Sequence, residues 1–581
     1  MISVCLIWAD AAVTCYILGF FILSRTGMSI PRRQSAYILT GLVAATVYAQ
    51  TWSLFGGVGG AALITLNAVC LVLGFICRKD AVNVFCAALR RLRKSGGRGV
   101  LYVLCAALWI LVFAAGTSCG QWHVDTPLYH AQSVHWIEAY GVVPGLGNLQ
   151  SHFAYNNACF SLYALYSFSW LGGQSFHAMS GFLALVVSSM CLFRDKTCED
   201  VSVTGLFVRL AVLADIWLQF DELTSPSSDG FYRLLCSAVI LLWYELLCRK
   251  EASPVPYAWV CMLAVYAVTV KLAAAPLVLL CIKPIVMILK SRQIRRLRVL
   301  LFFICCAVTV CLPFFIRGFI LSGWFLYPVL PQHLFDVPWR IPDGVGEYER
   351  LEIAANGFRI FDTAGIVAFG KTNHLHYVKT WFEGLSPIAG LLVIAALGAV
   401  VLVGMRGMGY MFGAMVRRMH GSERKNGRNL SQSAGYLFLE TVLAVCVCFC
   451  FYSSPQIRFE EVLLLLLCGL VYGNVADVCI LRLPAAAGSF LQKCVPPLPV
   501  FAAVLLLLLV LISGELSLSH PFLQQDYDRY PVTPYRIGGL EFYYPTEYVY
   551  TGYYAFPATR WRVQDAIPLG KDIRDGFRPD N

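Results

Sequence analysis

A length of 581 residues would ordinarily correspond to about three or four soluble domains. The composition excludes that class, because 58% of the residues are apolar and only 14% are charged, against about 25% charged residues in a soluble domain. The mean hydropathy is +0.66. The apolar runs are continuous rather than alternating, which excludes a β-barrel. The composition therefore predicts an all-α polytopic membrane protein.

The net charge of +11 does not indicate a nucleic-acid partner, because of where the basic residues lie. Of the 45 Lys and Arg residues, 27 fall in seven short segments that contain only six acidic residues. This clustering follows the positive-inside rule and predicts that the segments lie in the cytoplasm. The segments are 25–33, 78–98, 194–200, 249–251, 290–298, 406–428 and 482–493.

In chain order, the apolar stretches predict about fourteen spanning helices of ~17–25 residues each. No basic residue precedes the first span, so the N-terminus is expected outside, and fourteen spans return the C-terminus to that side. If the apolar stretch 157–171 crossed the membrane, the basic segment 194–200 would lie outside, so this stretch is expected to be interfacial or re-entrant. The spans lie near 1–23, 36–55, 58–77, 99–117, 177–193, 202–219, 231–248, 254–270, 272–289, 299–316, 386–405, 433–452, 459–478 and 497–513.

Three long polar segments remain on the predicted outer face. They are residues 118–176, named here the first loop, residues 317–385, named the second loop, and the C-terminal segment 514–581. The expected organisation is an N-terminal group of helices over 1–98, a core over 99–513 that carries both loops, and the C-terminal segment as part of a small outer cap. Polar mass on one face favours an enzyme over a transporter, which usually places its charges at the bilayer midplane.

The first loop begins with a carboxylate just before a predicted helix. Thr126 is expected to cap that helix, Pro127 to be its first residue and Gly141 to end it. Asp125 then lies at a helix N-terminus, where the helix dipole favours the ionised form that a general base needs. The alternative is that Asp125 only helps to cap the helix.

Ionisable and metal-ligating residues elsewhere give weaker signals. His123, His130 and His135 could form a metal site with Asp125, but they lack the spacing of known zinc motifs, so no metal and no cofactor is expected. A divalent ion at the acids Asp221, Glu222 and Asp229 stays open, with solvated loop acids as the alternative. Most of the ionisable residues within spans lie near span ends, where snorkelling explains them, and Asp10 is left without a role. These residues are Asp10, Arg209, Asp215, Lys271 and Lys283.

Several stretches carry a resemblance to a known superfamily. The segments Asp125-Thr126-Pro127-Leu128-Tyr129-His130 and Val143-Pro144-Gly145-Leu146-Gly147-Asn148-Leu149 are joined by three later ones, near 225–229, 317–342 and 454–459. Over roughly residues 99–480 the chain resembles the GT-C membrane glycosyltransferases. These include protein O-mannosyltransferases and lipid A aminoarabinose transferases, and the closest likeness is to a bacterial group of unassigned substrate. Two departures are Thr126, where Glu is often found, and the three spans before the first loop, where many members have one.

The resemblance implies a base and a donor. Asp125 matches the position of the catalytic Asp, and a polyprenyl-phosphate sugar is the implied donor. The chain has no nucleotide-binding motif, which agrees with a lipid-borne donor. Tyr129, His130, Asn148 and Asp229 lie in the matching stretches and are candidate substrate-binding residues.

The expected reaction is inverting transfer of a hexose or pentose to an unknown glycan, lipid or protein acceptor. It would take place on the outer face of a bacterial plasma membrane, in the synthesis of envelope polysaccharide. The phosphate that leaves needs cations, for which Lys271, Arg317 and Arg458 are candidates, with interface anchoring as the alternative for each. Asp125, Asp229 and Arg317 are expected to converge on one cavity.

Two other functions remain open. A polysaccharide polymerase or ligase would use Arg and His of a late loop rather than a carboxylate of the first loop. A transporter of lipid-linked saccharide would carry out no chemistry and would need a polar path across the midplane. A cavity open to the outer side, with Asp125 in its wall, would favour the glycosyltransferase.

Overall fold

The computed structural model describes residues 1–26, 33–94, 96–192, 202–290, 294–329, 335–419, 427–480 and 518–580, with a few residues between 498 and 508. The helices of the first part are α1 (Ile2–Thr26), α2 (Arg33–Trp52), α3 (Gly60–Ile76), α4 (Arg78–Lys94) and α5 (Gly97–Cys119). A π-helical turn η1 (Thr126–His130), α6 (Ala131–Tyr140), η2 (Leu146–Asn148), η3 (Ser151–Ala154), α7 (Ala158–Leu165) and α8 (Ser169–Gly172) form the first loop.

The rest of the bundle follows in chain order. It comprises α9 (Met179–Leu192), α10 (Val203–Leu218), η4 (Phe220–Glu222), α11 (Ser228–Cys248), α12 (Pro254–Val270), η5 (Leu272–Cys281), α13 (Ile282–Lys290), α14 (Ile294–Ser322), α18 (Pro387–Met419), α19 (Gly427–Ser453) and α20 (Ile457–Ile480). The second loop, after the end of α14, contains α15 (Asp343–Gly357), α16 (Thr363–Gly370) and α17 (Leu375–Glu383).

The bundle agrees with a helical membrane protein. Eight helices in the described residues are long and apolar enough to cross a membrane, and three shorter apolar helices lie over Gly60–Ile76, Met179–Leu192 and Pro254–Val270. A helix lies at each of the first thirteen predicted spans, whereas 497–513 falls mostly outside the described residues. The count of fourteen spans therefore stays a prediction.

The stretch 157–171 forms only short helices. α7 has eight residues, so it is about 12 Å long, whereas the hydrocarbon core of a bilayer is about 30 Å thick. All eight side chains are buried in the protein. The short length and the burial support the prediction that this stretch does not cross.

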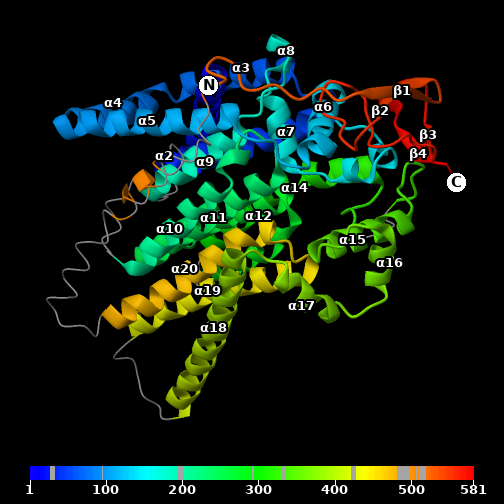
Figure 1. Cartoon of the computed structure of the whole chain (residues 1–581). Helices are drawn as coiled ribbons and strands as arrows, with labels where there is room; N and C mark the ends of the chain where they lie inside the picture. The colour runs from blue at the N-terminus through cyan, green and yellow to red at the C-terminus, as the bar shows by residue number, and fades with distance from the viewer. Residues whose placement is uncertain are drawn as a thin grey trace.

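The C-terminal segment corrects the all-α prediction. It forms two small antiparallel sheets, one of β1 (Val532–Ile537) and β2 (Leu540–Pro545), the other of β3 (Ala566–Pro568) and β4 (Phe577–Pro579), with η6 (Ile573–Asp575) between the last two strands. Alternating burial along β1 is the pattern of a strand with one covered face. The segment packs beside α6, at the same end of the molecule as α15 (Figure 1).

Both chain ends meet the first loop. The N-terminal ammonium group of Met1 donates hydrogen bonds to Ser118 Oγ at 2.6 Å and to the His520 carbonyl at 2.8 Å. Gln524, which is 2% exposed, donates to the Thr117 carbonyl at 2.8 Å. The N-terminus and the start of the C-terminal segment therefore lie side by side.

Candidate active site

A cavity of about 870 Å³ lies at the end of the bundle that carries both loops. Helices α12, α14 and α19 end there, and α11 and α20 begin there. The polar side chains in its wall come from both loops and from these helix ends, and they include Asp125, Tyr129, Asp229, Lys271, Glu349 and Arg458. Charged groups that are far apart in the sequence therefore share one cavity.

Asp125 occupies the N-cap position of the first-loop helix, where Thr126 was expected. Its side chain accepts no capping hydrogen bond. The carboxylate faces Arg458 instead, with Oδ2 at 3.3 Å from the Arg458 guanidinium and 3.8 Å from His123 Nδ1. The observed contacts therefore contradict the alternative that Asp125 only caps the helix.

Asp229 lies in the first turn of α11, whose N-cap is Ser227. Its Oδ1 accepts from Lys271 Nζ, and its Oδ2 lies 3.7 Å from Arg458 Nε. Arg458 thus stands between the carboxylates of Asp125 and Asp229. The aromatic ring of Phe459 lies under both cations, at 3.2 Å from Lys271 Nζ and 4.8 Å from the Arg458 guanidinium carbon.

The charges in the cavity keep Asp125 ionised. Burial raises the pKa of this carboxyl group, but the positive charge of Arg458 outweighs burial and lowers it below the ordinary value. Burial lowers the pKa of the Lys271 ammonium group, although the Asp229 carboxylate opposes this change. The arrangement places the carboxylates of Asp125 and Asp229 next to two cations.

Three of these groups have the donor atoms that a divalent ion accepts. One ligand atom each of His123, Asp125 and Asp229 lies within 4.8 Å of the others, and imidazole with two carboxylates suits several metals. Two cations, Lys271 and Arg458, already balance the two carboxylates. The cluster therefore offers no excess negative charge to attract a metal unless one of these cations moves away.

Five of the eight residues expected at the site line the cavity: Asp125, Tyr129, Asp229, Lys271 and Arg458. His130, Asn148 and Arg317 are not in its wall. His130 is 1% exposed, and burial lowers its pKa to about 3, so it is neutral. Its ring packs 5.8 Å from that of His123, which makes it a support for the site.

Asn148 and Arg317 have structural partners. The Asn148 amide donates to the carbonyls of Trp339 at 2.9 Å and Phe577 at 3.1 Å, which joins the first loop to the second loop and to β4. The expectation that Arg317 meets the two aspartates is corrected. Arg317 is 2% exposed and donates to Ser53 Oγ and to Asn156 Oδ1, the latter at 3.2 Å. Of these two partners, Asn156 lines the cavity.

Sequence reasoning considered His123 only as a ligand of a metal site that it did not expect, and it assigned no role to Glu349. His123 precedes Asp125 by two residues, and the backbone N–H of Asp125 donates to its Nδ1 at 3.1 Å. The short distance between His123 and Asp125 in the sequence could have indicated that His123 belongs to the site. Glu349 of α15 is 3% exposed and lines the cavity, but it is one of several acids in the second loop and no pattern distinguishes it from them.

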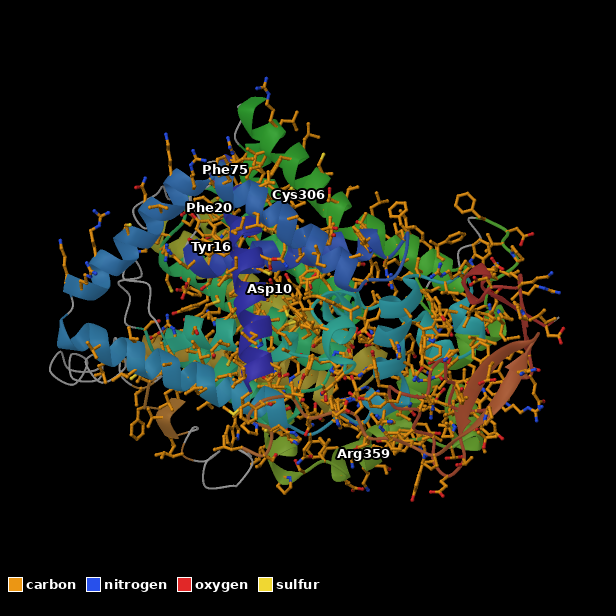
Figure 2. The ribbon with its side chains drawn as sticks, turned by 90° about the horizontal axis from the view of Figure 1, so that it is seen from above. Asp10, Tyr16, Phe20, Phe75, Cys306 and Arg359 are labelled. Atoms are coloured by element: carbon orange, nitrogen blue, oxygen red, sulfur yellow. The ribbon has the colours of Figure 1, made fainter. Side chains whose placement is uncertain are left out.

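Asp10, which has no role in the sequence analysis, is not in the cavity wall. It lies part way along α1, on the same helix as Tyr16 and Phe20 (Figure 2). The rings of Tyr16 and Phe20 stack at 6.1 Å. Asp10 is thus separate from the candidate site.

Comparison with known proteins gives one match. A family model described as "Domain of unknown function (DUF8201)" matches residues 1–465. No curated protein and no solved structure matches the chain. The matched range contains all the helices of the bundle as far as the first turns of α20, including every charged residue of the cavity named above. Because the match covers well over half of the 581 residues, the chain belongs to the DUF8201 family.

Proposed function

We propose that this protein is an inverting glycosyltransferase that moves a sugar from a polyprenyl-phosphate carrier to an acceptor on the outer face of a bacterial plasma membrane. The observation that carries the proposal is that one cavity holds the Asp125 carboxylate, paired with Arg458, and the Lys271 ammonium group, paired with Asp229. A base and two cations are the groups that transfer from a phosphate requires. The cavity lies at the end of apolar helices, where a lipid carrier can reach it.

The chemistry assigns one task to each group. Asp125 takes the proton of an acceptor hydroxyl, which contributes about 10²–10⁴-fold to the rate. The acceptor oxygen forms a bond to the anomeric carbon, and the bond from that carbon to the phosphate oxygen breaks on the opposite face, so the configuration inverts. The electron pair leaves with the phosphate, where Lys271 and Arg458 stabilise the added charge.

The apolar part of the cavity wall suits a lipid. Phe449 and Tyr452, near the end of α19, line the cavity and are 37% and 87% exposed. Phe314 of α14 lines it as well. These apolar surfaces allow an isoprenoid chain to lie in the bilayer while its phosphate enters the cavity, which agrees with a donor carried on lipid.

The transporter alternative has less support. Several ionisable groups within the bundle are paired with one another, such as Arg233 with Asp215 at 2.7 Å and Arg406 with Glu440 at 2.7 Å. Ion pairs of this kind hold helices together and do not form a free polar path. The polymerase or ligase alternative stays open, since it uses the same donor class.

The proposal is tested with the purified full-length protein in lipid vesicles. The probes are short-chain polyprenyl-phosphate hexoses and pentoses with a radiolabelled sugar, supplied with membrane extract as the source of acceptor. We expect wild type to consume one of these donors and release unlabelled polyprenyl phosphate. Movement of an intact donor between leaflets, without consumption, would favour the transporter.

A further inference from the structure

A second polar cluster occupies the cavity, formed by groups from both loops. Glu349 of the second loop accepts a hydrogen bond from the Tyr155 hydroxyl of the first loop. His152 Nε2 lies 3.9 Å from the same carboxylate oxygen. All three residues line the cavity, and the proposed transfer chemistry uses none of them.

The cavity face of α15 extends this cluster along the helix. Glu349, Glu352 and Asn356 are spaced by three and four residues, so they lie on one face, and all three line the cavity. Within the part of the chain that the structure describes, the Asn356 Oδ1 atom is buried without a hydrogen-bond partner. A buried acceptor without a partner destabilises the folded protein, and a donor group of a ligand would remove that cost.

Aromatic rings lie between this cluster and Asp125. The Tyr129 ring centroid is 4.9 Å from that of His152 and 6.0 Å from that of Tyr155, and the Tyr155 ring is 6.3 Å from that of Tyr327. The wall therefore combines ring faces with carboxylate and amide oxygens. Sugar rings are complementary to such a wall, because they present C–H groups on their faces and hydroxyl donors at their edges.

The charge at this end of the cavity argues against an anionic ligand. Glu347, Glu349 and Glu352 line it, with Arg350 as the cation of the same stretch. A phosphate group placed here would meet like charges, whereas Lys271 and Arg458 receive it at the other end. Neutral hydroxyl donors suit a wall that consists mainly of acceptors.

We propose that Glu349, Asn356 and the rings of Tyr129 and Tyr155 form a saccharide subsite that holds the acceptor, so that the acceptor of this enzyme is a neutral glycan. This inference rests on the proposed function only in naming the bound saccharide as the acceptor; the binding itself does not depend on it. Glu349 accepts hydrogen bonds from sugar hydroxyls, and Tyr155 and His152 hold its carboxylate in place. A peptide or an anionic lipid acceptor is the competing class.

The experiment measures binding to the detergent-solubilised full-length protein, without any donor. The probes are the neutral disaccharides cellobiose, chitobiose and mannobiose, followed by saturation-transfer difference NMR. We expect at least one to bind to wild type, and Glu349→Gln and Asn356→Ala each to weaken that binding at least about tenfold. Glu383→Gln is the matched control, because Glu383 lies in the same loop with its side chain 63% exposed and paired with Lys379 at 3.8 Å.

The outcomes separate the subsite from the proposed function. If no disaccharide binds to wild type, or if both variants bind as wild type does, the subsite is rejected. Binding of a serine-containing peptide or an anionic phospholipid that depends on Glu349, with no saccharide binding, also rejects it. Because the assay contains no donor, a wild type that binds saccharide but never transfers sugar rejects the glycosyltransferase alone. Tyr155→Phe, which keeps the ring, carries the test if Glu349→Gln does not fold.

Discussion

Two groups of charged side chains meet at the start of α20, and they differ in how closely they are paired. Inside the bundle, Arg233 donates to Asp215 Oδ1 at 2.8 Å through Nε and to Glu461 Oε2 at 3.0 Å. It also donates to the backbone carbonyl of Arg458 at 3.3 Å. In the cavity, the Arg458 side chain lies 3.3 Å from Asp125 and 3.7 Å from Asp229.

The difference separates a structural network from a site that exchanges partners. Asp215 is fully buried and has Arg233 and Gln219 as partners, so its charge is compensated inside the protein. In the cavity, Arg458 holds two carboxylates at longer distances and is 40% exposed. The exposed part of this guanidinium is available to a phosphate while both carboxylates stay beside it. The tight network fixes the position of α20, and the loose one is available for chemistry.

Breaking the tight network should have the largest effect. Arg233→Met leaves Asp215 and Glu461 without their cation, and loss of one partner of a buried pair costs about 3–5 kcal/mol. We expect a large fall in the yield of folded protein and in the temperature of thermal unfolding in detergent. Lys379→Met, a change at a side chain that is 85% exposed, is the matched control and should be nearly neutral. Equal unfolding temperatures for Arg233→Met and wild type would show that the network does not hold the bundle.

Removing the base should have the next largest effect, and only on turnover. Asp125→Asn keeps the shape of the side chain, but an amide cannot take the acceptor proton, so donor consumption should fall at least ~10²-fold. The unfolding temperature should stay near that of wild type, because Asp125 makes no capping bond and Arg458 keeps Asp229 as a partner. Asp336→Asn, an exposed position in the second loop, is the control. Near-normal consumption by Asp125→Asn would reject Asp125 as the base.

The sequence predicted the positions of the helices but not the strands or the ion pairs between helices. Continuous apolar runs located the helices, because burial in lipid requires about 20 apolar residues in a row. The same rule explains the error in the C-terminal segment, where short strands such as β1 carry no lipid-length signal. The rule also treated Arg209 and Asp215 as snorkelling residues near span ends. Their partners, Glu245 at 3.6 Å and Arg233 at 2.7 Å, lie on α11, and a pairing between helices is not visible in one sequence.

The candidate site was also predicted only in part. Asp125, Asp229, Lys271 and Arg458 were expected from loop position and resemblance, and the structure brings them into one cavity. Arg317 and Asn148 satisfied the same criteria, but their side chains bind Asn156 and two backbone carbonyls instead. Sequence position indicates the end of the bundle at which a residue lies. It does not give the direction of its side chain, which packing between the loops decides.

A change that keeps the charge of Arg458 should sharpen the comparison. Arg458→Lys retains one positive charge but loses the planar guanidinium that spans Asp125 and Asp229, and the two residue types are not equivalent at such sites. Hydrogen bonds to charged groups contribute about 1.5–3 kcal/mol, so we expect kcat/KM for the donor to fall about 30-fold. Lys379→Arg, a substitution on the surface, is the control. An unchanged kcat/KM would show that Arg458 acts as a general counter-charge rather than as a phosphate clamp.

A third carboxylate, that of Glu138, shows the effect of burial without a cation such as Arg458 beside it in the part of the chain that the structure describes. Glu138 of α6 accepts from Ser175 Oγ at 2.7 Å and from the Tyr553 hydroxyl at 2.6 Å, and it has no ion pair among the described residues. Burial raises its pKa to about 6, although these hydrogen bonds oppose the change. Asp125, which is half-buried beside Arg458, keeps a lowered pKa. The pKa values of the two acids are therefore shifted in opposite directions.

The smallest predicted effect follows from that contrast. Because folding raises the pKa of Glu138 above its ordinary 4.5, its stabilisation is fully present below about pH 4.5 and is lost as the pH rises through about 6, by at most ~2 kcal/mol. Tyr553 belongs to the C-terminal segment, so the contact between that segment and α6 should loosen over this range. Hydrogen exchange in residues 520–560, corrected for its intrinsic pH dependence, should accelerate between about pH 5 and pH 7. Glu138→Gln stays neutral and should remove that dependence, whereas Glu541→Gln, an exposed acid of β2, should leave it unchanged. A variant Glu138→Gln that keeps the wild-type pH dependence would show that another group controls the contact.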